Sequence, residues 1–264
     1  MESNLEVLFT PADFSALPQR DLSASLCVVF DVLRATSTML TALANGASRI
    51  YPVSEIAEAL QLRSSHPGFL LAGERDGVRI LSAQSGGVDF DLGNSPREFT
   101  PERVAGRVII ITTTNGTRAM LHARRAEQVL VASFVNAAAI VARLLDCENV
   151  AILCAGTDGL ISDDDVLLAG LLVDRLQRQA GMVYQQNAQA MTARETWLNA
   201  FALPQALGAE PLAPDRLAER LRNSLGAKNL LALGLDADIA AAARIDSMDV
   251  VPRLDPQTFR IGRA

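Results

Sequence analysis

Short apolar runs alternate with segments of helical periodicity along most of the chain. Each apolar run spans four to seven residues and is rich in Val, Ile or Leu, which is typical of buried strands. The strand-like runs are Glu6–Phe9, Ala24–Phe30, Arg49–Val53, Phe69–Ala72, Val108–Ile111, Gln128–Ala132 and Val150–Cys154. The helical patterns are Thr36–Ala44, Ile56–Ser64, Thr117–Ala123, Ala137–Leu145 and Asp163–Ala180. This alternation predicts an α/β fold, a three-layer α/β/α arrangement with a mostly parallel or mixed sheet.

Two stretches of the chain repeat the same order of elements. Residues 45–60 run from a helix end through a short strand to Ser54 and into another helix, and residues from Arg125 do the same through Ser133. The correspondence predicts two similar halves from an internal duplication, although any α/β protein can give such matches. We expect a single compact α/β unit over residues 1–264, with halves 1–145 and 146–264 as the alternative division.

The composition limits the class of partner. With 264 residues, 49% of them hydrophobic, the chain can bury a large core. Its net charge of −6 argues against nucleic acid and requires an anionic substrate to find a locally positive pocket. Cys27, Cys147 and Cys154 lack metal-ligand spacing, so we expect reduced thiols in a cytoplasmic protein. No signal peptide or membrane span is expected. The oligomeric state stays open, a homodimer included.

Polar side chains follow the strand-like runs. The run that ends at Phe30 is followed by Asp31, Arg34, Thr36 and Ser37, and hydroxyl-rich or acidic turns follow the runs that end at positions 111 and 154. In open α/β sheets, ligands bind just beyond the carboxyl ends of the strands. A carboxylate there can hold a cation, while Arg, Thr hydroxyls and a helix N-terminus can hold an oxyanion. The pattern predicts a metal together with phosphate or another tetrahedral anion.

Several familiar hydrolytic motifs are missing from the sequence. There is no GxxxxGK[ST] loop, no GxSxG elbow, and no second aspartate two positions after Asp31. Cys154 is not followed by the arginine of a cysteine phosphatase loop. Because His66 and His122 are the only histidines, a His-rich binuclear metal site is also excluded. The cation that remains is one with oxygen ligands, most naturally Mg²⁺.

The motifs together resemble the Mg²⁺-dependent 2-phosphosulfolactate phosphatases of coenzyme M biosynthesis and their bacterial relatives, over nearly the whole chain. The motifs are Phe-Asp-Val-Leu-Arg-Ala-Thr-Ser-Thr (30–38), Ala-Gly-Glu-Arg (72–75), Phe-Asp-Leu-Gly-Asn-Ser-Pro (90–96), Thr-Thr-Thr-Asn-Gly-Thr-Arg-Ala (112–119), Cys-Ala-Gly-Thr-Asp-Gly (154–159), Leu-Leu-Ala-Leu-Gly-Leu-Asp-Ala-Asp-Ile (230–239) and Asp-Val-Val-Pro (249–252). Two departures stand out. Three aspartates follow Ser162 where the family often has Leu-Glu-Asp, and the segment after Gly77 matches loosely.

The resemblance implies hydrolysis of the phosphate monoester of 2-phospho-3-sulfolactate, or of a related small phosphorylated acid, to 3-sulfolactate and phosphate. A metal-activated water is the expected nucleophile, and a covalent phosphoenzyme through Asp31 is the rival. A non-catalytic binding protein for a small phosphorylated or sulfonated metabolite is the alternative from another class. Such a protein would keep the Arg and Thr clusters but would have no use for the acidic residues.

Four carboxylates are candidate metal ligands: Asp31, Glu74, Asp164 and Asp165. Asp31 ends a buried strand, where an unpaired charge is costly, but it could instead cap a helix. Glu74 could be a ligand, a general base or half of a structural pair with Arg75. Asp164 and Asp165 could complete the metal shell or could simply begin a helix, whose dipole favours carboxylates there.

Two arginines are candidate anion-binding residues. Arg34 and Arg118 each follow a strand end within a hydroxyl cluster, and a guanidinium matches phosphate and sulfonate oxygens in two-point contacts. A structural salt bridge is the alternative for each. Asn115-Gly116 is expected to allow the positive φ that lets N–H groups converge on an anion, or to form a simple tight turn. With Asp31 and Glu74, these arginines form the expected catalytic set, and the expected substrate-binding residues are Thr36, Ser37, Arg75, Asn94, Ser95, Thr113, Thr114, Asn115, Gly116 and Thr117.

Overall fold

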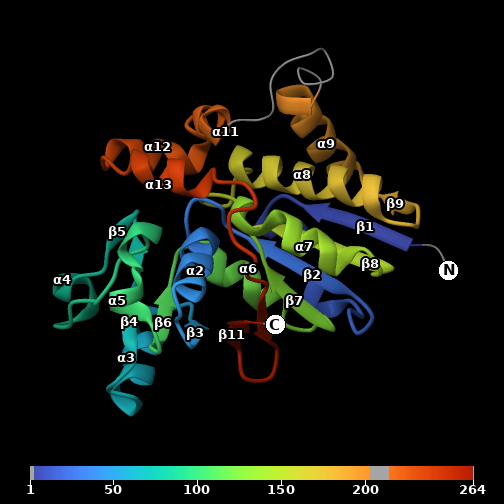
Figure 1. The fold of residues 1–264 in the computed structure, drawn as a ribbon. Helices are drawn as coiled ribbons and strands as arrows, with labels where there is room; N and C mark the ends of the chain where they lie inside the picture. The colour runs from blue at the N-terminus through green and yellow to red at the C-terminus, as the bar shows by residue number, and fades with distance from the viewer. Residues whose placement is uncertain (1–2, 203–213, 264) are drawn as a thin grey trace.

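One mixed β-sheet runs through the protein in the computed structural model, which describes residues 3–202 and 214–263. The sheet confirms the predicted α/β class (Figure 1). Its strands follow the order β5-β4-β6-β3-β11-β10-β7-β2-β8-β1-β9. Their bounds are β1 (Ser3–Leu8), β2 (Leu26–Phe30), β3 (Arg49–Pro52), β4 (Leu70–Arg75), β5 (Val78–Arg79), β6 (Val108–Thr112), β7 (Gln128–Val131), β8 (Asn149–Cys154), β9 (Tyr184–Gln186), β10 (Pro252–Asp255) and β11 (Arg260–Arg263).

The sheet consists of two parallel blocks joined by an antiparallel hairpin. Strands β4, β6 and β3 form one block, and β7, β2, β8, β1 and β9 form the other. The hairpin β10–β11 lies between them, with β11 pairing antiparallel with β3 and β10 antiparallel with β7. Under the predicted duplication, β4, β6 and β3 would correspond to β8, β2 and β7, and the strand order is compatible with that correspondence. The duplication itself stays a prediction.

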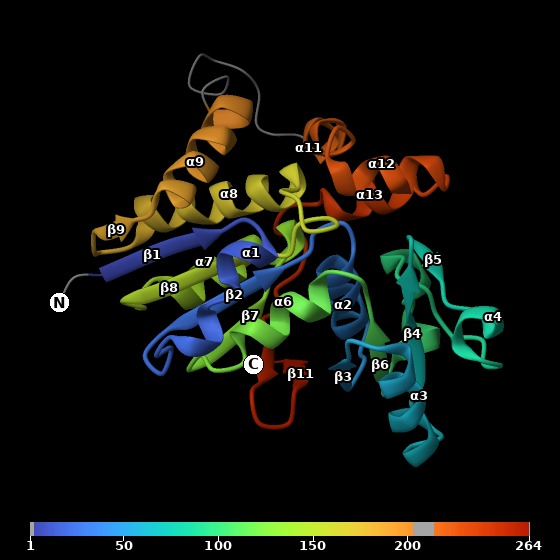
Figure 2. The same ribbon diagram turned by 180° about the vertical axis from the view of Figure 1, so that it is seen from behind.

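Helices cover both faces of the sheet, as the alternation along β2 requires. Val28 and Phe30 pack in one core with α7 and α8, while Cys27 and Val29 pack in the other with α2 and α6. Helix α7 lies in front of the sheet in Figure 1 and α6 in front of it in Figure 2. The longer helices are α2 (Ala35–Ala44), α3 (Ile56–Ser65), α6 (Gly116–Ala123), α7 (Ala137–Leu144), α8 (Asp163–Gln179), α9 (Ala188–Trp197), α11 (Pro214–Leu221), α12 (Leu225–Ala232) and α13 (Asp236–Ala242).

Short helical turns complete the described structure. They are α1 (Pro11–Phe14), α4 (Ser82–Ser85), α5 (Pro101–Val104), the 3₁₀ turns Leu17–Gln19, Pro96–Glu98 and Phe134–Asn136, and a π turn at Leu198–Ala202. The sequence predicted the helix over Asp163–Ala180 to within one residue but did not anticipate β9. Near the end of the described chain, the structure has the hairpin β10–β11. In the described part of the chain, no helix combines the length and apolar character needed to cross a membrane.

Candidate active site

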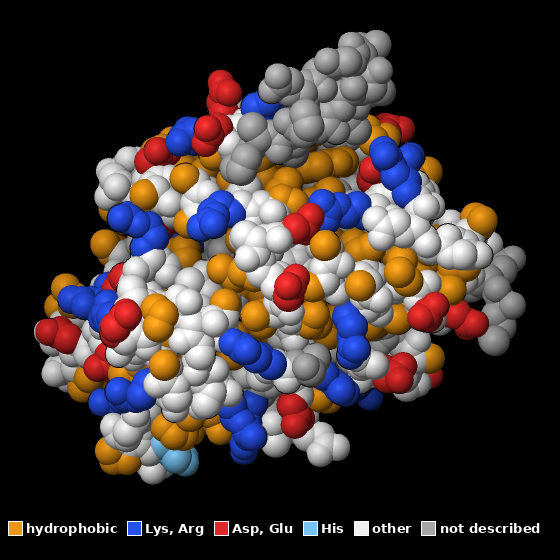
Figure 3. All heavy atoms as spheres, viewed as in Figure 1, with side chains coloured by type: hydrophobic (Ala, Val, Ile, Leu, Met, Phe, Trp, Pro, Cys, Tyr) orange, Lys and Arg blue, Asp and Glu red, His pale blue; other side chains and the backbone are white. Residues whose placement is uncertain are grey.

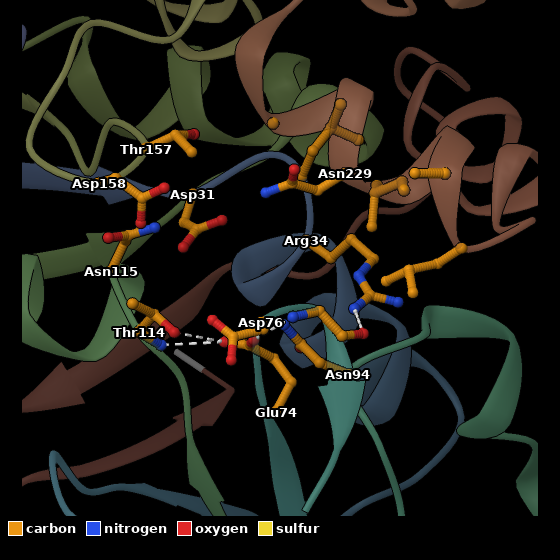
Figure 4. A pocket seen from close by; sticks show the side chains of 16 residues that line it. Asp31, Arg34, Glu74, Asp76, Asn94, Thr114, Asn115, Thr157, Asp158 and Asn229 are labelled. Atoms are coloured by element: carbon orange, nitrogen blue, oxygen red, sulfur yellow. Dashed lines mark hydrogen bonds between the residues drawn. The ribbon is translucent and has the colours of Figure 1, made fainter.

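A cavity of about 360 Å³ lies where the carboxyl ends of four strands meet the C-terminal helices. Asp31 follows β2, Glu74 lies near the end of β4, Thr114 follows β6, and Thr157 follows β8. Helix α12 closes another side of the cavity with Gly226, Asn229 and Leu230 among others. Figure 4 shows the polar side chains of these elements arranged around one hollow. The position agrees with the general rule for ligand sites in α/β sheets.

Asp31 is a buried carboxylate in the wall of this cavity. Its Oδ1 accepts a hydrogen bond of 3.3 Å from the backbone N–H of Ala35, at the start of α2. Burial raises the pKa of Asp31 to about 7, and the nearby carboxylates of Asp164 and Glu74 add to this rise, against backbone donors at Ala35 and Gly116. A buried carboxyl with so raised a pKa is the kind of group that gains most from a bound cation or proton.

Glu74 reaches the same cavity from β4. Its Oε1 accepts hydrogen bonds from the backbone N–H of Thr114 at 3.0 Å and from the Thr114 hydroxyl at 3.1 Å. Its Oε2 accepts one of 2.8 Å from the N–H of Gly77. These contacts fix the carboxylate and join the end of β4 to the loop after β6, so Glu74 is oriented before any ligand arrives.

Arg34 lines the cavity but is held in a buried ion pair. Its Nη1 lies 2.9 Å from Oδ2 of Asp238 on α13, and its Nη2 donates to the carbonyl of Gly77 at 2.6 Å. The other oxygen of Asp238 accepts a hydrogen bond of 2.7 Å from the hydroxyl of Ser95. The salt-bridge alternative is therefore the arrangement present, although Arg34 still borders the cavity. Ser95 supports this ion pair and does not line the cavity.

The hydroxyls at the start of α2 bind protein atoms. The hydroxyl of Thr36 donates to the carbonyl of Asp31 at 2.9 Å, and that of Ser37 donates to the carbonyl of Val32 at 2.7 Å. Ser37 also lies 2.7 Å from the hydroxyl of Ser133. Neither side chain lines the cavity, and both fix the turn that presents Asp31. Substrate binding by these two residues stays a prediction.

The loop after β6 divides into pocket and framework residues. Thr114 and Asn115 line the cavity, whereas the Thr117 hydroxyl donates to the carbonyl of Thr113 at 3.0 Å. The hydroxyl oxygen of Thr113 is buried and has no hydrogen-bond partner among the described residues. Gly116 does not adopt the expected positive φ. It is needed for space instead, since a Cβ there would lie 3.0 Å from Oδ2 of Asp31 and 2.8 Å from Cβ of Ala35.

Asp164 and Asp165 begin α8 and do not line the cavity. The two oxygens of Asp165 accept hydrogen bonds from the backbone N–H groups of Val32 at 3.0 Å and Gly156 at 2.9 Å. Asp164 accepts a hydrogen bond from the Ser162 hydroxyl. Burial raises the pKa of both carboxyls, and the nearby carboxylates of Asp164 and Asp31 raise the pKa of Asp165 further. Their oxygens bind the loops around Asp31, and metal binding by these two carboxylates stays a prediction.

Two predicted anion-binding arginines lie outside the cavity. The side chain of Arg118 is exposed on α6, one turn beyond the loop that lines the site. Arg75 follows Glu74 on β4 and points the other way, with its Nη2 donating to the Thr112 hydroxyl at 3.0 Å and to the carbonyl of Ser54 at 3.2 Å. Arg75 thus binds framework atoms and Arg118 lies outside the cavity, and a role in substrate binding stays a prediction for both.

Several cavity residues were not predicted from the sequence. Asp158 lies within the Thr-Asp-Gly motif after β8, so its strand-end position was a usable signal. Asp76, in the turn between β4 and β5, follows the Glu74-Arg75 motif directly. Asn229 lines the cavity from α12, one residue before the 230–239 motif. Asp238 lies within that motif and pairs with Arg34 without lining the cavity itself.

The side chains around the cavity determine whether a metal ion can bind there. In residues 3–202 and 214–263, no group of three or more His, Cys, Asp or Glu side chains could hold one, so the predicted set of four carboxylates is not assembled. Asp31 and Glu74 nevertheless share the cavity with Asn94, whose buried Oδ1 has no hydrogen-bond partner in the described part of the chain. Mg²⁺ is usually held by one or two carboxylates with substrate phosphate and water. This smaller oxygen set fits Mg²⁺.

The fold and the cavity define an α/β protein with a carboxylate-lined site at the carboxyl ends of its parallel strands. Residues 13–257 match the family described as 2-phosphosulpholactate phosphatase, and the chain belongs to this family of phosphoric monoester hydrolases.

Curated relatives match the chain over nearly its whole length. A probable 2-phosphosulfolactate phosphatase from Thermotoga petrophila is 36% identical, over 92% of this chain and 94% of its own. A relative of the same description from Caldanaerobacter subterraneus subsp. tengcongensis is 36% identical, over 94% and 95%. Another, from a Synechococcus species, is 38% identical, over 90% and 93%. The resemblance inferred from the motifs is thereby confirmed.

Proposed function

We propose that the protein is a Mg²⁺-dependent phosphatase that hydrolyses 2-phospho-3-sulfolactate to 3-sulfolactate and inorganic phosphate. The relatives are described as probable 2-phosphosulfolactate phosphatases and match the chain over more than nine-tenths of their length, which supports this substrate. A role in coenzyme M biosynthesis and a cytoplasmic location remain predictions that accompany this proposal.

The negative charge of the cavity lining is the observation that supports the proposed dependence on Mg²⁺. Asp31, Glu74, Asp76 and Asp158 line it, and the single arginine among the lining residues, Arg34, is paired with Asp238. A phosphate ester that also carries a sulfonate is strongly anionic and would be repelled by such a lining. A divalent cation would reverse the local charge. An anionic substrate can therefore bind to this acidic lining only together with a cation.

Asp31, Glu74 and the amide oxygen of Asn94 are the residues that would hold Mg²⁺. When bound, the ion would neutralise charge on the phosphoryl oxygens and make a bound water more acidic. The Thr114 and Gly77 N–H groups keep the Glu74 carboxylate in one orientation. Because the carboxylate is already oriented, no free energy is needed to reorient it during the reaction.

The proposed reaction is direct attack of water on phosphorus. The new P–O bond forms as the bond to the substrate's ester oxygen breaks, and the released alkoxide takes up a proton to give the hydroxyl of 3-sulfolactate. Asn115 and Asn229 border the cavity and could donate hydrogen bonds to substrate oxygens. In the rival mechanism the phosphoryl group would first be transferred to Asp31, which would make this carboxylate an acyl phosphate.

The test is release of inorganic phosphate from 2-phospho-3-sulfolactate, with 2-phospholactate as the matched substrate that lacks the sulfonate. We expect rapid release from the first, slower release from the second, and loss of both in excess EDTA. Failure to release phosphate from either substrate in the presence of Mg²⁺ would refute the proposal. Rapid quenching with ³²P-labelled substrate separates the mechanisms, because label bound covalently to the enzyme would establish the Asp31 phosphoenzyme instead.

A further inference from the structure

A second cleft, of about 940 Å³, lies at the other end of the strands from the active site. It is bordered by the segment from Gly46 to Arg49, which leads into β3, and by the hairpin β10–β11. Strand β3 is a parallel neighbour of β6, whose carboxyl end leads to Thr114 in the active site. Ligands in the two hollows would therefore not compete for space. In Figure 1 the hairpin lies at the bottom of the view, and α12 and α13 lie at the top.

Strand alternation places several side chains on one face of the hairpin. Leu254 and Ile261 are fully buried and point into the core beneath α2 and α6. Arg253 is paired with Gly262 across the hairpin, and Arg260 with Asp255, so the side chains of these residues point to the opposite face. A Cβ on Gly262 would meet no atom within 4 Å, so the space opposite Arg253 is open.

The cleft is strongly basic in a protein of net charge −6. Four arginines line it, against one carboxylate: Arg49, Arg253, Arg260 and Arg263, with Asp255. The Asp255 carboxylate already accepts hydrogen bonds from the backbone N–H groups of Gln257 at 2.8 Å and Thr258 at 3.1 Å. No ion pair involves any of the four arginines within the described ranges. The positive charges of this cleft thus exceed the one negative charge of Asp255, which lies opposite Arg260 in the hairpin. Lys and Arg side chains are visible around the hairpin in the lower part of Figure 3.

Arg260 contacts an aromatic side chain of the neighbouring strand β3. Its guanidinium lies 5.3 Å from the centre of the Tyr51 ring, which is a cation–π contact. Its Nε is buried and has no hydrogen-bond partner among the described residues. Because an unsatisfied buried donor is costly, this N–H is ready for an acceptor that the protein itself does not supply. Arg263 closes the cleft on the side of α2, where it donates to the carbonyls of Leu43 and Ala44.

We propose that this cleft binds a polyanionic small molecule with two or more phosphate groups, such as a nucleoside polyphosphate or an inorganic polyphosphate. Guanidinium groups match phosphate oxygens in two-point contacts, and several of them spread along a hairpin suit several phosphates better than one. The volume of about 940 Å³ also exceeds what a single phosphate would fill. The proposal is independent of the phosphatase activity, because it concerns residues at the other end of the strands.

Isothermal titration calorimetry with sodium tripolyphosphate tests this site. Arg49→Gln and Arg253→Gln remove exposed side chains and leave the buried pair Leu254 and Ile261 in place, so both variants should fold. Each should weaken tripolyphosphate binding about ten- to a hundred-fold, the range expected for loss of a charge-assisted contact. Arg260→Gln should weaken it further. Arg97→Gln, which removes an exposed arginine outside the cleft, should bind like the unmodified protein.

The outcomes decide the proposal. Binding to the unmodified protein that is lost in the three cleft variants and kept in Arg97→Gln supports it. Absence of binding, or equal binding by all variants, overturns it, since the anion would then bind nowhere or bind at the active site. Phosphate release by Arg253→Gln should match that of the unmodified enzyme, which separates a failure of this site from a failure of the proposed catalytic function.

Discussion

The guanidinium of Arg34 and the carboxylate of Asp238 form a buried ion pair of 2.9 Å, with exposed side-chain fractions of 4% and 0%. The two residues are 204 positions apart in sequence. Their contact joins the loop after β2 to α13, and the hydroxyl of Ser95 binds the same carboxylate. The ion pair therefore connects three segments at the border of the active site.

Asp238→Asn should destabilise the protein and impair catalysis together. Removing one partner of a buried ion pair leaves the other charge uncompensated, which typically costs about 3–5 kcal/mol of unfolding free energy. Urea denaturation measures the stability, and kcat and KM for phosphate release measure the effect on Arg34. Asp236, two positions before Asp238, forms an exposed ion pair with Arg222. Asp236→Asn is therefore the matched control, and we expect little change in its stability or its kinetics. Equal stability of the two variants would contradict the role given to the buried pair.

Arg34→Ala and Arg118→Ala should differ sharply. Arg34 borders the cavity and is buried, so its loss should lower kcat/KM by at least ten-fold, a loss typical of charge-assisted contacts. Arg118 is exposed and lies outside the cavity, so Arg118→Ala should keep nearly full activity. Steady-state kinetics on both variants checks the expectation. A large loss in Arg118→Ala would show that α6 moves toward the substrate when it binds.

Asp31→Asn should abolish phosphate release while leaving the fold intact or more stable. Burial raises the pKa of Asp31 to about 7, which means that the folded protein disfavours its charge when no cation is bound. Asn keeps the shape without the charge, so the melting temperature without Mg²⁺ should stay equal or rise. The stabilisation by added Mg²⁺ that we expect for the unmodified protein should disappear. Asp146→Asn, an exposed aspartate outside the cavity, is the control that should retain activity and Mg²⁺ stabilisation.

Gly116→Ala should reduce activity through a steric effect on Asp31. The added Cβ would lie 2.8 Å from Cβ of Ala35 and 3.0 Å from Oδ2 of Asp31, both tighter than ordinary contacts. The carboxylate or the start of α2 must therefore shift, and a displacement of this size at a reacting group can cost about a hundred-fold in rate. Gly159→Ala is a control, because a Cβ there would meet no atom within 4 Å, although its positive φ of 78° adds some strain. Full activity of Gly116→Ala would mean that Asp31 is not held as tightly as its contacts indicate.

Removal of divalent cations should abolish phosphate release, and Mg²⁺ should restore it. The acidic lining repels an anionic substrate unless a cation is present, so substrate affinity should fall together with turnover. Dialysis against EDTA followed by titration with Mg²⁺ measures both the loss and its reversal. Titration with Na⁺ at equal ionic strength controls for general screening. Persistent activity after complete removal of metal would rule out the Mg²⁺-dependent mechanism.

The sequence by itself determined the α/β class and the residues at the strand ends. Alternate residues of apolar runs such as Val28–Phe30 pack against the helices on the two faces of the sheet. The sequence could predict this arrangement because the period-two pattern of strands and the period-3.6 pattern of helices are local properties of the chain. Asp31, Glu74 and Thr114 could be placed near a ligand because a strand end has a fixed position relative to its sheet. These predictions required only neighbouring residues and the general geometry of parallel strands.

Only the tertiary structure decided which polar side chains share the cavity. Arg34, Arg118, Asp164 and Asp165 looked equivalent as polar residues beside strand ends, yet one pairs with a helix 204 residues away and one is exposed. The two aspartates at the start of α8 bind loops around Asp31. The partner of a charged side chain depends on long-range packing, which the local pattern does not encode. For the same reason, the basic cleft at the hairpin has no signature in the sequence: its arginines come together only when β11 pairs with β3.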